Sequence, residues 1–542
     1  MSLRIVPSKS WRRLGAMRKL CRSYERLARE GGLSRIRAVK NALVDRPLFS
    51  PHLGADAWFW AARLESAEIP ARQFAQDRYI GVDFHRALIA ALGSTRSPVS
   101  VPLPPAWLDL LQEHGLPVSR VRSLASWYWQ ALLRMCQGMM LIASILGRGL
   151  TSRDSIGKTA SDAAHLLSLT PTNLPPPDVY QRPYDICSWY ANWPGRIARI
   201  RRLFHDVPIG GLRQANAMPV QYRSPPGDEA PTCAALLKFT IWGVGACTFA
   251  ALGLLAGRWW HAMLLTEAAK AKLVSLRTRD ELAAEYLFAY SANTYRPLWT
   301  YAAAEKGSLI SLYFYSTYEQ IKLPQGYESQ KYEWGAANWP RYIVWDEWHA
   351  AQLQRDLGTD INVVAAGTIA FSDSGQAVPA GKGPRIAVFD VPPFRKLAHF
   401  GTSTLADYRH LAPGVDLDFV SDIADALHAN GAAMLLKQKR DIGNRGLRAY
   451  SRMIDSLCRR ENVTMVDSAI SAARLIASCD AVISIPFTST ALYAREMGIP
   501  TAYYDPSSVI DKSDRAAHQI PILSGPVELK YWIAQLVDTL AK

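Results

Sequence analysis

One segment, DAVISIPFTSTALYAREMGIPTAYYD at 480–505, constrains the fold of this chain more than any other. The short apolar, β-branched run Ala481–Ile485 predicts a buried strand. Pro486–Thr488 ends that strand, and Ser489–Met497 predicts a helix with a hydroxyl residue at its start. Ile499–Tyr504 predicts a second strand. Strand, turn, helix and strand in this order indicate a unit of a parallel sheet.

The turn in this segment is rich in hydroxyl groups. Within seven residues the chain places Ser484, Thr488, Ser489 and Thr490. The helix that begins here also presents free backbone N–H groups and the positive end of its dipole. None of the four residues is a catalytic base, so we expect the turn, with Pro486 and Phe487, to hold a phosphate and not to attack one.

Alternating strand and helix patterns extend this unit over most of the chain. Residues 385–542 predict one doubly wound domain, and residues 161–371 predict another, with an apolar insertion at 231–265. The Gly-, Ser- and Pro-rich stretch 372–384 is typical of a linker. Residues 1–160 predict a mostly helical, basic region. The predicted fold class is therefore α/β, with two facing Rossmann-type domains, an N-terminal helical region and a ligand cleft between the two sheets.

The strands predicted in the first domain are short. They are His165–Leu169, Asp185–Tyr190, Ala217–Tyr222, Leu287–Ser291, Ser308–Tyr315, Arg341–Trp345 and Asn362–Ala366.

Positive charge is concentrated at the start of the chain. The formal net charge is +15, and residues 1–47 hold thirteen Lys or Arg against three Asp or Glu, a net of +10. Apolar residues at near-helical spacing predict a basic amphipathic helix there. It is either a solvated terminus or an attachment to an anionic membrane surface. No nucleic-acid recognition motif is present, and we expect no nucleic-acid partner.

Phe239–Gly257 carries no charge over 19 residues, close to the length that spans a bilayer. It predicts a transmembrane helix, a monotopic or re-entrant insertion, or a buried core helix. A single crossing would separate the two parts of one domain across the membrane. We therefore favour membrane association without crossing.

Several motifs are absent from the sequence. The lack of GxGxxG after the first strand of either domain argues against a dinucleotide redox enzyme, and the lack of GxxxxGK[ST] excludes an NTPase P-loop. There is no HExxH and no Cys/His cluster at zinc spacing, so no metal or cofactor is expected. Seven scattered cysteines indicate no disulfide framework.

Charged residues follow two other strands of the second domain. Lys437, Lys439 and Arg440 follow the strand in AAMLLKQKRD, and Asp390 follows the strand in IAVFDVPPF. Lysine binds phosphate as a point charge and arginine as a bidentate fork. The basic group and the hydroxyl-rich turn together predict a clamp for a polyanion, although KQKRD alone is also typical of an exposed loop.

Catalysis at such a cleft also needs a carboxylate, either as a general base or as a nucleophile. Asp346 and Glu347 end a strand of the first domain, and Asp390 faces them from the second, so all three are candidates. The alternative roles are helix capping for Asp346, helix charge balance for Glu347, and orientation of Lys437 for Asp390. Acceptor-site candidates at other strand ends are Thr294, Arg296, Tyr315 and Ser316.

IPFTS and the following ALYAREMGIPTAYYDP, preceded by LLKQKRD and VFDVPPF, resemble the bacterial polysaccharide-biosynthesis proteins named for their PFTS motif, over roughly 285–510. Those proteins are distantly similar to GT-B glycosyltransferases of the sialyl- and Kdo-transferase type, which use CMP-activated sugars. There a Ser/Thr motif and a basic or His-Pro motif hold the nucleotide phosphate. The resemblance implies the first role for the four hydroxyl residues and the second for Lys437 and Lys439.

The resemblance implies a GT-B glycosyltransferase of bacterial surface-polysaccharide synthesis. The clamp would neutralise the charge that develops on the leaving phosphate, so no metal ion is needed. Its partners would be a nucleotide sugar, with a CMP-sugar favoured, and a lipid-linked or growing glycan acceptor. It would lie at the cytoplasmic face of the inner membrane, as a peripheral or monotopic protein. The alternatives are transfer of a phosphopolyol from a CDP-activated donor and a non-catalytic scaffold of a polysaccharide assembly complex. The sequence does not predict an oligomeric state.

Overall fold

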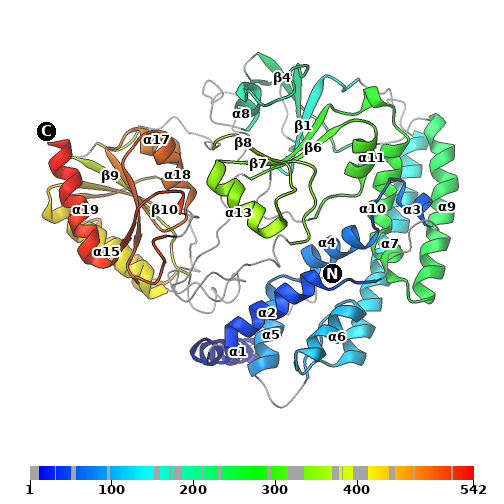
Figure 1. Ribbon diagram of the computed structural model, residues 1–542, viewed down its shortest axis with the longest axis horizontal. Helices are drawn as coiled ribbons and strands as arrows, with labels where there is room; N and C mark the ends of the chain where they lie inside the picture. The colour runs from blue at the N-terminus through cyan, green and yellow to red at the C-terminus, as the bar shows by residue number, and fades with distance from the viewer. Residues whose placement is uncertain are drawn as a thin grey trace.

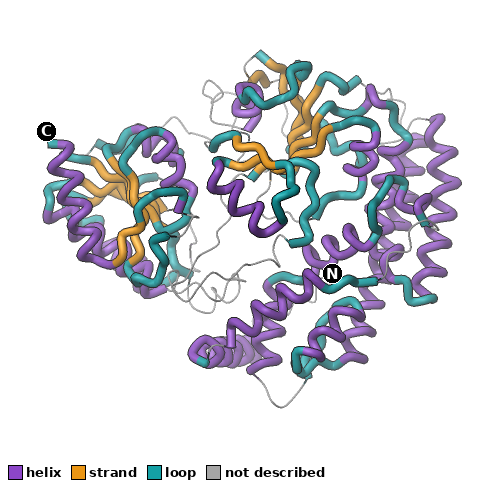
Figure 2. The backbone as a smooth tube through the Cα atoms, in the orientation of Figure 1, coloured by secondary structure: helices purple, strands orange, loops and turns teal. Residues whose placement is uncertain are grey.

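The computed structural model describes residues 11–30, 32–49, 56–93, 98–151, 159–169, 174, 186–208, 213–215, 217–229, 233–289, 295–314, 335–368, 377–380, 383–394, 413–438, 443, 446–467, 470–513 and 517–541. In these residues two mainly parallel sheets are arranged along the longest axis of the molecule, each with helices around it (Figures 1 and 2). The predicted GT-B-like α/β class with two Rossmann-type domains is confirmed.

The first sheet has eight strands. They are β1 (Ala163–Leu167), β2 (Arg202–His205), β3 (Arg213–Ala215), β4 (Met218–Tyr222), β5 (Glu285–Ala289), β6 (Leu309–Tyr313), β7 (Tyr342–Val344) and β8 (Val363–Ala365). Their order is β3-β4-β2-β1-β5-β6-β7-β8, and only the β3–β4 pair is antiparallel. The chain therefore builds outward from β1 in one direction and then in the other, as in doubly wound folds.

The second sheet has six parallel strands in the order β11-β10-β9-β12-β13-β14. They are β9 (Arg385–Asp390), β10 (Ala433–Gln438), β11 (Val463–Met465), β12 (Ala481–Ser484), β13 (Thr501–Asp505) and β14 (Ile522–Ser524). This is the Rossmann strand order, with its topological switch point between β9 and β12. Ligands of such sheets bind outside the carboxyl ends of the strands at that point.

Helices cover both faces of the second sheet. The core on one face contains side chains of α15 (Pro413–Ala429), α16 (Arg448–Leu457) and α19 (Gly525–Leu540). The core on the other face contains side chains of α17 (Ala472–Ala477) and α18 (Ser489–Glu496). Successive residues of a strand point to opposite faces, so each strand end offers side chains to both.

One predicted strand, Asp185–Tyr190, is wrong. Asp185 lies outside the described residues, and Ile186–Asn192 form the helix α8. The buried residues of α8 that pack on the first sheet include Ile186, Cys187, Tyr190 and Ala191. They recur at helical spacing, so the burial follows a period near 3.6 and not the alternation of a half-buried strand.

Before β1, every described regular element is a helix. These helices are α1 (Trp11–Arg29), α2 (Gly32–Asp45), α3 (Ala57–Trp60), α4 (Glu68–Tyr79), α5 (Val82–Gly93), α6 (Pro105–Glu113) and α7 (Arg120–Thr151). The remaining helices of the first domain are α9 (Cys233–Leu255), α10 (Trp259–Ser275), α11 (Trp299–Glu305) and α13 (Glu347–Leu357), with a short 3-10 turn at Arg279–Glu281.

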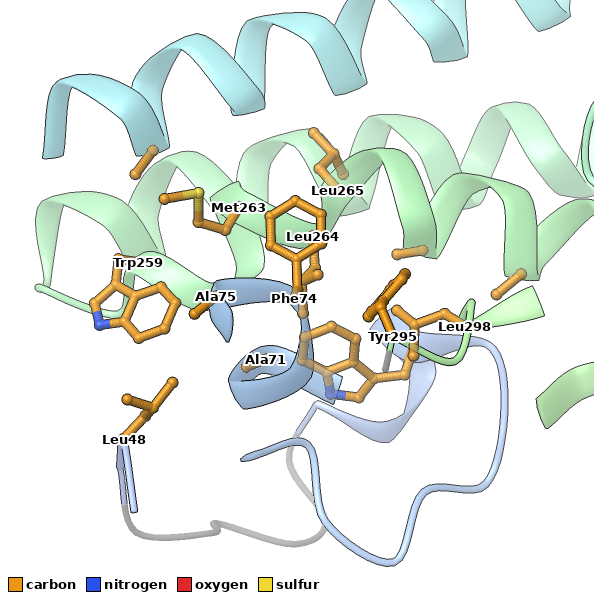
Figure 3. Packing of buried hydrophobic residues seen from close by; sticks show 14 of the residues in the cluster. Leu48, Ala71, Phe74, Ala75, Trp259, Met263, Leu264, Leu265, Tyr295 and Leu298 are labelled. Carbon is orange, nitrogen blue, oxygen red and sulfur yellow. The ribbon is translucent and has the colours of Figure 1, made fainter. Parts of the chain in front are cut away.

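The helix α10 is the centre of this helical region. Its side chains Trp259, Met263, Leu264 and Leu265 are buried and belong to the same core cluster as Phe74 of α4 (Figure 3). The same cluster continues onto one face of the first sheet. The N-terminal helices and the insertion therefore share one core with the first Rossmann-type domain.

The two domains also share a core. One cluster of buried apolar residues contains residues of the first domain, among them Tyr313, Ile343 and Trp345, together with a smaller set from the second. The residues of the second domain are Phe487, Ala491, Leu492, Tyr503, Ile510, Ala517, Ile520 and Ile522. The turn of the PFTS motif therefore lies at the junction between the domains.

A buried carboxylate fixes α8 to the first sheet. Glu285 in β5 accepts hydrogen bonds from Tyr190 Oη of α8 at 2.6 Å and from Ser311 Oγ at 2.8 Å. It also forms an ion pair with Arg341, whose Nε donates to Ser311 Oγ at 2.9 Å. Since Glu285 is fully buried, Arg341 supplies the charge that its carboxylate requires.

We predict that Arg341→Ala lowers the free energy of unfolding by about 3–5 kcal/mol, because it leaves the Glu285 carboxylate buried without a counter-charge. Thermal unfolding followed by circular dichroism measures this loss. Adding Glu285→Gln to Arg341→Ala should restore part of the stability, since the amide needs no cation. Equal melting temperatures for Arg341→Ala and the unsubstituted protein would contradict this account.

Candidate functional site

The PFTS turn connects β12 to α18 at the switch point of the second sheet. Its hydroxyl groups bond to one another: Ser484 Oγ lies 3.0 Å from Thr490 Oγ1, which lies 3.3 Å from Thr488 Oγ1. Thr488 occupies the N-cap position of α18, but its side chain makes no capping bond and donates instead to the Ile485 carbonyl at 2.9 Å. The helix dipole and this hydroxyl cluster, which includes the half-buried Thr488, Ser489 and Thr490, are the features of an anion site.

Phe487 gives the turn its shape. Its backbone has a φ of 63°, in the left-handed region that a bulky residue rarely adopts. Its side chain is buried in the core between the domains, with its ring centroid 5.8 Å from that of Tyr503. Tyr503 Oη in turn donates to the Thr488 carbonyl at 3.3 Å. The packing of the ring compensates for the backbone strain, and strain of this kind is common at ligand sites.

Lys437 lies in the same row across the sheet as Ser484, the residue at the start of this turn. Phe389 of β9 is in register with Lys437 of β10 on one side and with Ser484 of β12 on the other. Neighbouring strands are about 4.8 Å apart, so the Cα atoms of Lys437 and Ser484 are separated by roughly 10 Å. Phe389 belongs to the core beneath α17 and α18, so the row points to the face that α18 covers. The sheet therefore places the predicted lysine and the hydroxyl residue Ser484 on the same face.

The Lys437 ammonium is held beside the next strand. Its Nζ donates to the Asp467 carbonyl, just after β11, at 3.3 Å. Burial lowers the pKa of Lys437, and the negative charge of Asp467 opposes that change. Reaching an anion on the turn requires the side chain to rotate from β11 toward β12. Lys439 and Arg440, the other predicted basic residues, lie outside the described residues.

Asp390 ends β9 on the opposite face of the sheet. It is buried, Tyr450 of α16 donates to its Oδ2, and its Oδ1 has no hydrogen-bond partner among the described residues. Gln438 Nε2 donates to Tyr450 Oη at 3.0 Å. Burial raises the pKa of Asp390 to about 7, although the Tyr450 hydrogen bond acts in the other direction.

Asp416 of α15 forms a pair with Asp390. It is also buried, and burial together with the charge of Asp390 raises the pKa of Asp416 to about 8. Two interacting carboxyl groups of this kind titrate as a unit. Sequence patterns do not indicate Asp416, because an acidic residue in the first turn of a helix usually serves the helix itself. Tyr450 is one of many tyrosines, and no motif sets it apart.

Asp346 joins the two domains. It is the N-cap of α13 and accepts from the backbone N–H of His349 at 2.9 Å. Its Oδ2 forms an ion pair with Arg495 of α18 at 2.7 Å and lies 2.7 Å from Nδ1 of His518. Burial alone would raise the pKa of Asp346, but the His518 and Arg495 contacts hold it well below its usual value. Asp346 is therefore engaged as a capping and interdomain residue, and its low proton affinity makes it a poor base.

The other predicted residues differ in their surroundings. Glu347 is exposed in the first turn of α13. Arg296 is buried, and it donates to Thr300 Oγ1 at 3.1 Å and to the Asn338 carbonyl at 3.3 Å, within the core shared with the N-terminal helices. Thr294, Tyr315 and Ser316 lie outside the described residues. In the part of the chain that the structure describes, no group of three or more His, Cys, Asp or Glu residues is arranged to hold a metal ion.

The two sheet orders define an α/β protein with two Rossmann-type domains, the arrangement of GT-B-like proteins. The chain belongs to the family of polysaccharide biosynthesis PFTS motif proteins, whose model matches residues 242–533. No curated protein matches it. Among solved structures, UDP-N-acetylglucosamine 2-epimerase from Rickettsia bellii is similar, with 8% identity and a TM-score of 0.29 over 70% of this chain and 97% of that one.

The carboxyl pair predicts how stability depends on pH. In the folded protein the pKa values of Asp390 and Asp416 are raised above their ordinary value of 3.8, so both groups stabilise the fold when protonated. That stabilisation is complete below about pH 4 and is lost as pH rises through 7 to 8. We therefore expect Asp416→Asn to gain stability relative to the unsubstituted protein between pH 5 and pH 8, by a few kcal/mol at most.

Melting temperatures across this pH range measure the difference. Asp425→Asn is the matched control, because Asp425 lies on the same helix, is exposed and pairs with Arg460 at 2.5 Å. Parallel curves for Asp416→Asn and the unsubstituted protein at all pH values would show that the pair does not bind a proton near neutral pH.

Proposed function

We propose that the protein is a glycosyltransferase of bacterial surface-polysaccharide biosynthesis, which transfers a sugar from a nucleotide donor to a lipid-linked or growing glycan. The observation that carries the proposal is the row Lys437, Phe389 and Ser484 at the switch point, next to the N-terminus of α18. Hydroxyl groups, a helix N-terminus and a lysine at one strand edge suit a nucleotide phosphate. Membership of a polysaccharide biosynthesis family supports a sugar-linked nucleotide.

In this proposal the hydroxyl groups of Ser484, Thr488, Ser489 and Thr490 bind the donor phosphate. Pro486 and Phe487 shape the turn, and Lys437 rotates from Asp467 to the phosphate when the donor binds. Lys439 and Arg440, which follow in the chain, add positive charge. The cations stabilise the charge that develops on the leaving phosphate. A CMP-activated sugar is the favoured donor.

Asp390 is the proposed proton acceptor. The acceptor hydroxyl oxygen bonds to the anomeric carbon, and the bond from that carbon to the phosphate oxygen breaks with its electron pair going to the nucleotide. The hydroxyl proton passes to the Asp390 carboxylate. A pKa of about 7 suits a general base at neutral pH. The Asp390 Oδ1 has no hydrogen-bond partner among the described residues, but it is buried, so the proposal requires the strand end to open before an acceptor hydroxyl can reach it. The existing contacts of Asp346 and the exposure of Glu347 favour Asp390 over both.

We place the enzyme at the cytoplasmic face of the bacterial inner membrane, as a peripheral or monotopic protein. Two long apolar helices, at Arg120–Leu150 and Ala235–Leu255, support this placement.

Nucleotide binding tests the donor site. Thermal shifts of the full-length protein with CMP, CDP, UDP, GDP and dTDP should identify at least one ligand, since a nucleotide at 100 times its Kd stabilises the fold by about 2.7 kcal/mol. We expect Lys437→Ala to lower the affinity for that nucleotide about tenfold, because the variant loses one charge-assisted hydrogen bond. Lys530→Ala is the control, because Lys530 is exposed on α19, on the opposite face of the sheet from the Lys437 row.

Release of the nucleotide from its sugar donor, in the presence of a glycan acceptor, then tests the reaction. The proposal predicts release that Asp390→Asn reduces by a factor of 100 or more while nucleotide binding persists. Absence of binding by all five nucleotides, or equal affinities for Lys437→Ala and Lys530→Ala, would contradict the donor site. Binding without release would favour the scaffold alternative.

A further inference from the structure

The outward face of α9 is unusual because it is apolar and exposed. Leu237, Ile241 and Val244 are 67%, 67% and 65% exposed, and Leu252 and Leu255 continue the same stripe. The spacing of these residues follows one side of a helix. The opposite side, with Phe239, Trp242, Ala246 and Ala250, is buried. The helix α9 is thus apolar on its exposed side as well as on its buried side. It carries more apolar side chains than the core of the domain requires.

The helix α7 extends this surface. Its exposed side chains include Trp129, Met139, Met140 and Leu150, and α7 packs directly on α9. The two helices approach closely where a Cβ on Gly243 would lie 2.9 Å from Ile142 of α7. Trp58 of α3, itself exposed, packs against Phe249 of α9 with ring centroids 5.4 Å apart. We refer to the exposed apolar residues of α7 and α9, together with Trp58, as the α7–α9 surface.

The charges on α7 and α9 have one sign. The helix α7 carries four arginines and α9 one lysine, and neither contains an acidic residue. Arg122 and Arg148 of α7 and Lys238 of α9 are exposed. A second copy of the chain docked face to face would bring these cations together, whereas anionic lipid headgroups would neutralise them. Exposed tryptophans and basic residues at the edges of an apolar face are typical of a membrane interface.

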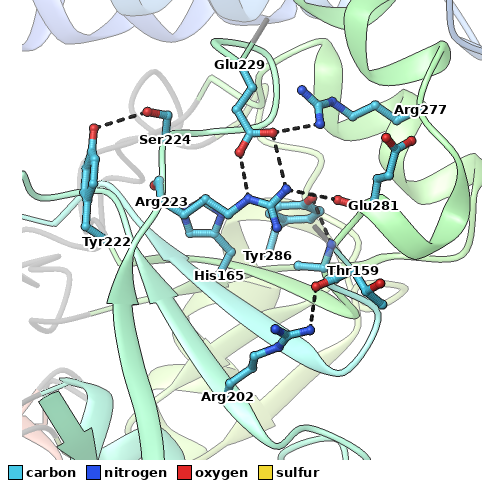
Figure 4. A network of polar contacts seen from close by, with 11 residues as sticks. Thr159, His165, Arg202, Tyr222, Arg223, Ser224, Glu229, Arg277, Glu281 and Tyr286 are labelled. Atoms are coloured by element: carbon cyan, nitrogen blue, oxygen red, sulfur yellow. Dashed lines mark hydrogen bonds and ion pairs between the residues drawn. The ribbon is translucent and has the colours of Figure 1, made fainter. Parts of the chain in front are cut away.

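The connections of α9 prevent it from crossing a bilayer alone. It turns at Ala256–Arg258 into α10, whose Leu264, Ala268 and Ala271 are fully buried. At the other end, Glu229, which precedes α9, pairs with Arg223 after β4 and with Arg277 after α10, both at 2.7 Å (Figure 4). A crossing of α9 would require α10 to leave the core and these ion pairs to break.

We propose that the α7–α9 surface docks the protein onto an anionic lipid bilayer, with both helices lying flat in the interface and neither crossing it. The proposal rests on the membrane location proposed above and not on glycosyl transfer. The helix α9 is about 34 Å long and exposes apolar residues from one end to the other, so its whole length is available for contact. In Figure 1 it lies at the end of the molecule that is opposite the second domain. Docking there leaves the donor site clear of the bilayer.

Flotation of the full-length protein with lipid vesicles tests this proposal. The probes are vesicles of phosphatidylcholine alone and of phosphatidylcholine with one quarter phosphatidylglycerol. We expect the unsubstituted protein to bind the anionic vesicles. The triple variant Leu237→Ser, Ile241→Ser and Val244→Ser should have a partition coefficient onto these vesicles that is lower by roughly tenfold or more. The double variant Val527→Ser and Tyr531→Ser on α19 is the matched control, since these side chains are 79% and 66% exposed. It should bind as the unsubstituted protein does.

Two further measurements separate the alternatives. Sedimentation velocity of both variants reports the oligomeric state, and thermal shift with the nucleotide identified above reports the donor site. The proposal is overturned if the triple variant floats as well as the control, or if it changes the oligomeric state without changing flotation. Loss of flotation with intact nucleotide binding supports the docking surface. If the unsubstituted protein binds vesicles but no nucleotide, that result contradicts only the proposed donor site.

Discussion

The register of three parallel strands is the constraint on which the site depends. Because β10, β9 and β12 are neighbours, Lys437, Phe389 and Ser484 fall in one row at the carboxyl edge. The next residue of β9, Asp390, points to the opposite face and meets Tyr450 and Asp416. One strand end thus presents a lysine and hydroxyl groups on one face and a pair of carboxyl groups on the other. A shift of one residue in the register would exchange these two faces, and the hydroxyl groups and the lysine would no longer share one.

The junction between the domains explains the form of the PFTS turn. Phe487 is buried in the core that both domains share, and its strained backbone directs the following residues to the start of α18. The same helix carries Arg495, which pairs with Asp346 of the first domain. The start of α18 and the residue that contacts the first domain therefore belong to the same helix of eight residues.

Local features of the sequence predict the β12–α18–β13 unit well, because apolar runs, a proline-containing turn and a hydroxyl residue at the helix start act within a few residues. The structure also contains the helix cap considered for Asp346, because a capping hydrogen bond likewise acts within a few residues. Asp185–Tyr190 was predicted wrongly because the burial of α8 is imposed by a sheet whose strands come from elsewhere in the chain. The Asp390, Asp416 and Tyr450 group was not predictable, since three separate elements bring it together. The sequence left three alternatives for α9, and only its exposed stripe argues against the buried core helix.

The central claim is that a nucleotide phosphate binds at the start of α18. The most direct measurement is an experimental structure of the full-length protein with the nucleotide that gives the largest thermal shift. The account predicts a phosphate within hydrogen-bond distance of Ser484, Thr488 or Thr490 and of the first backbone N–H groups of α18, with the Lys437 ammonium moved from Asp467 to the phosphate. A nucleotide bound in the first domain, or one whose phosphate contacts none of these groups, would contradict it.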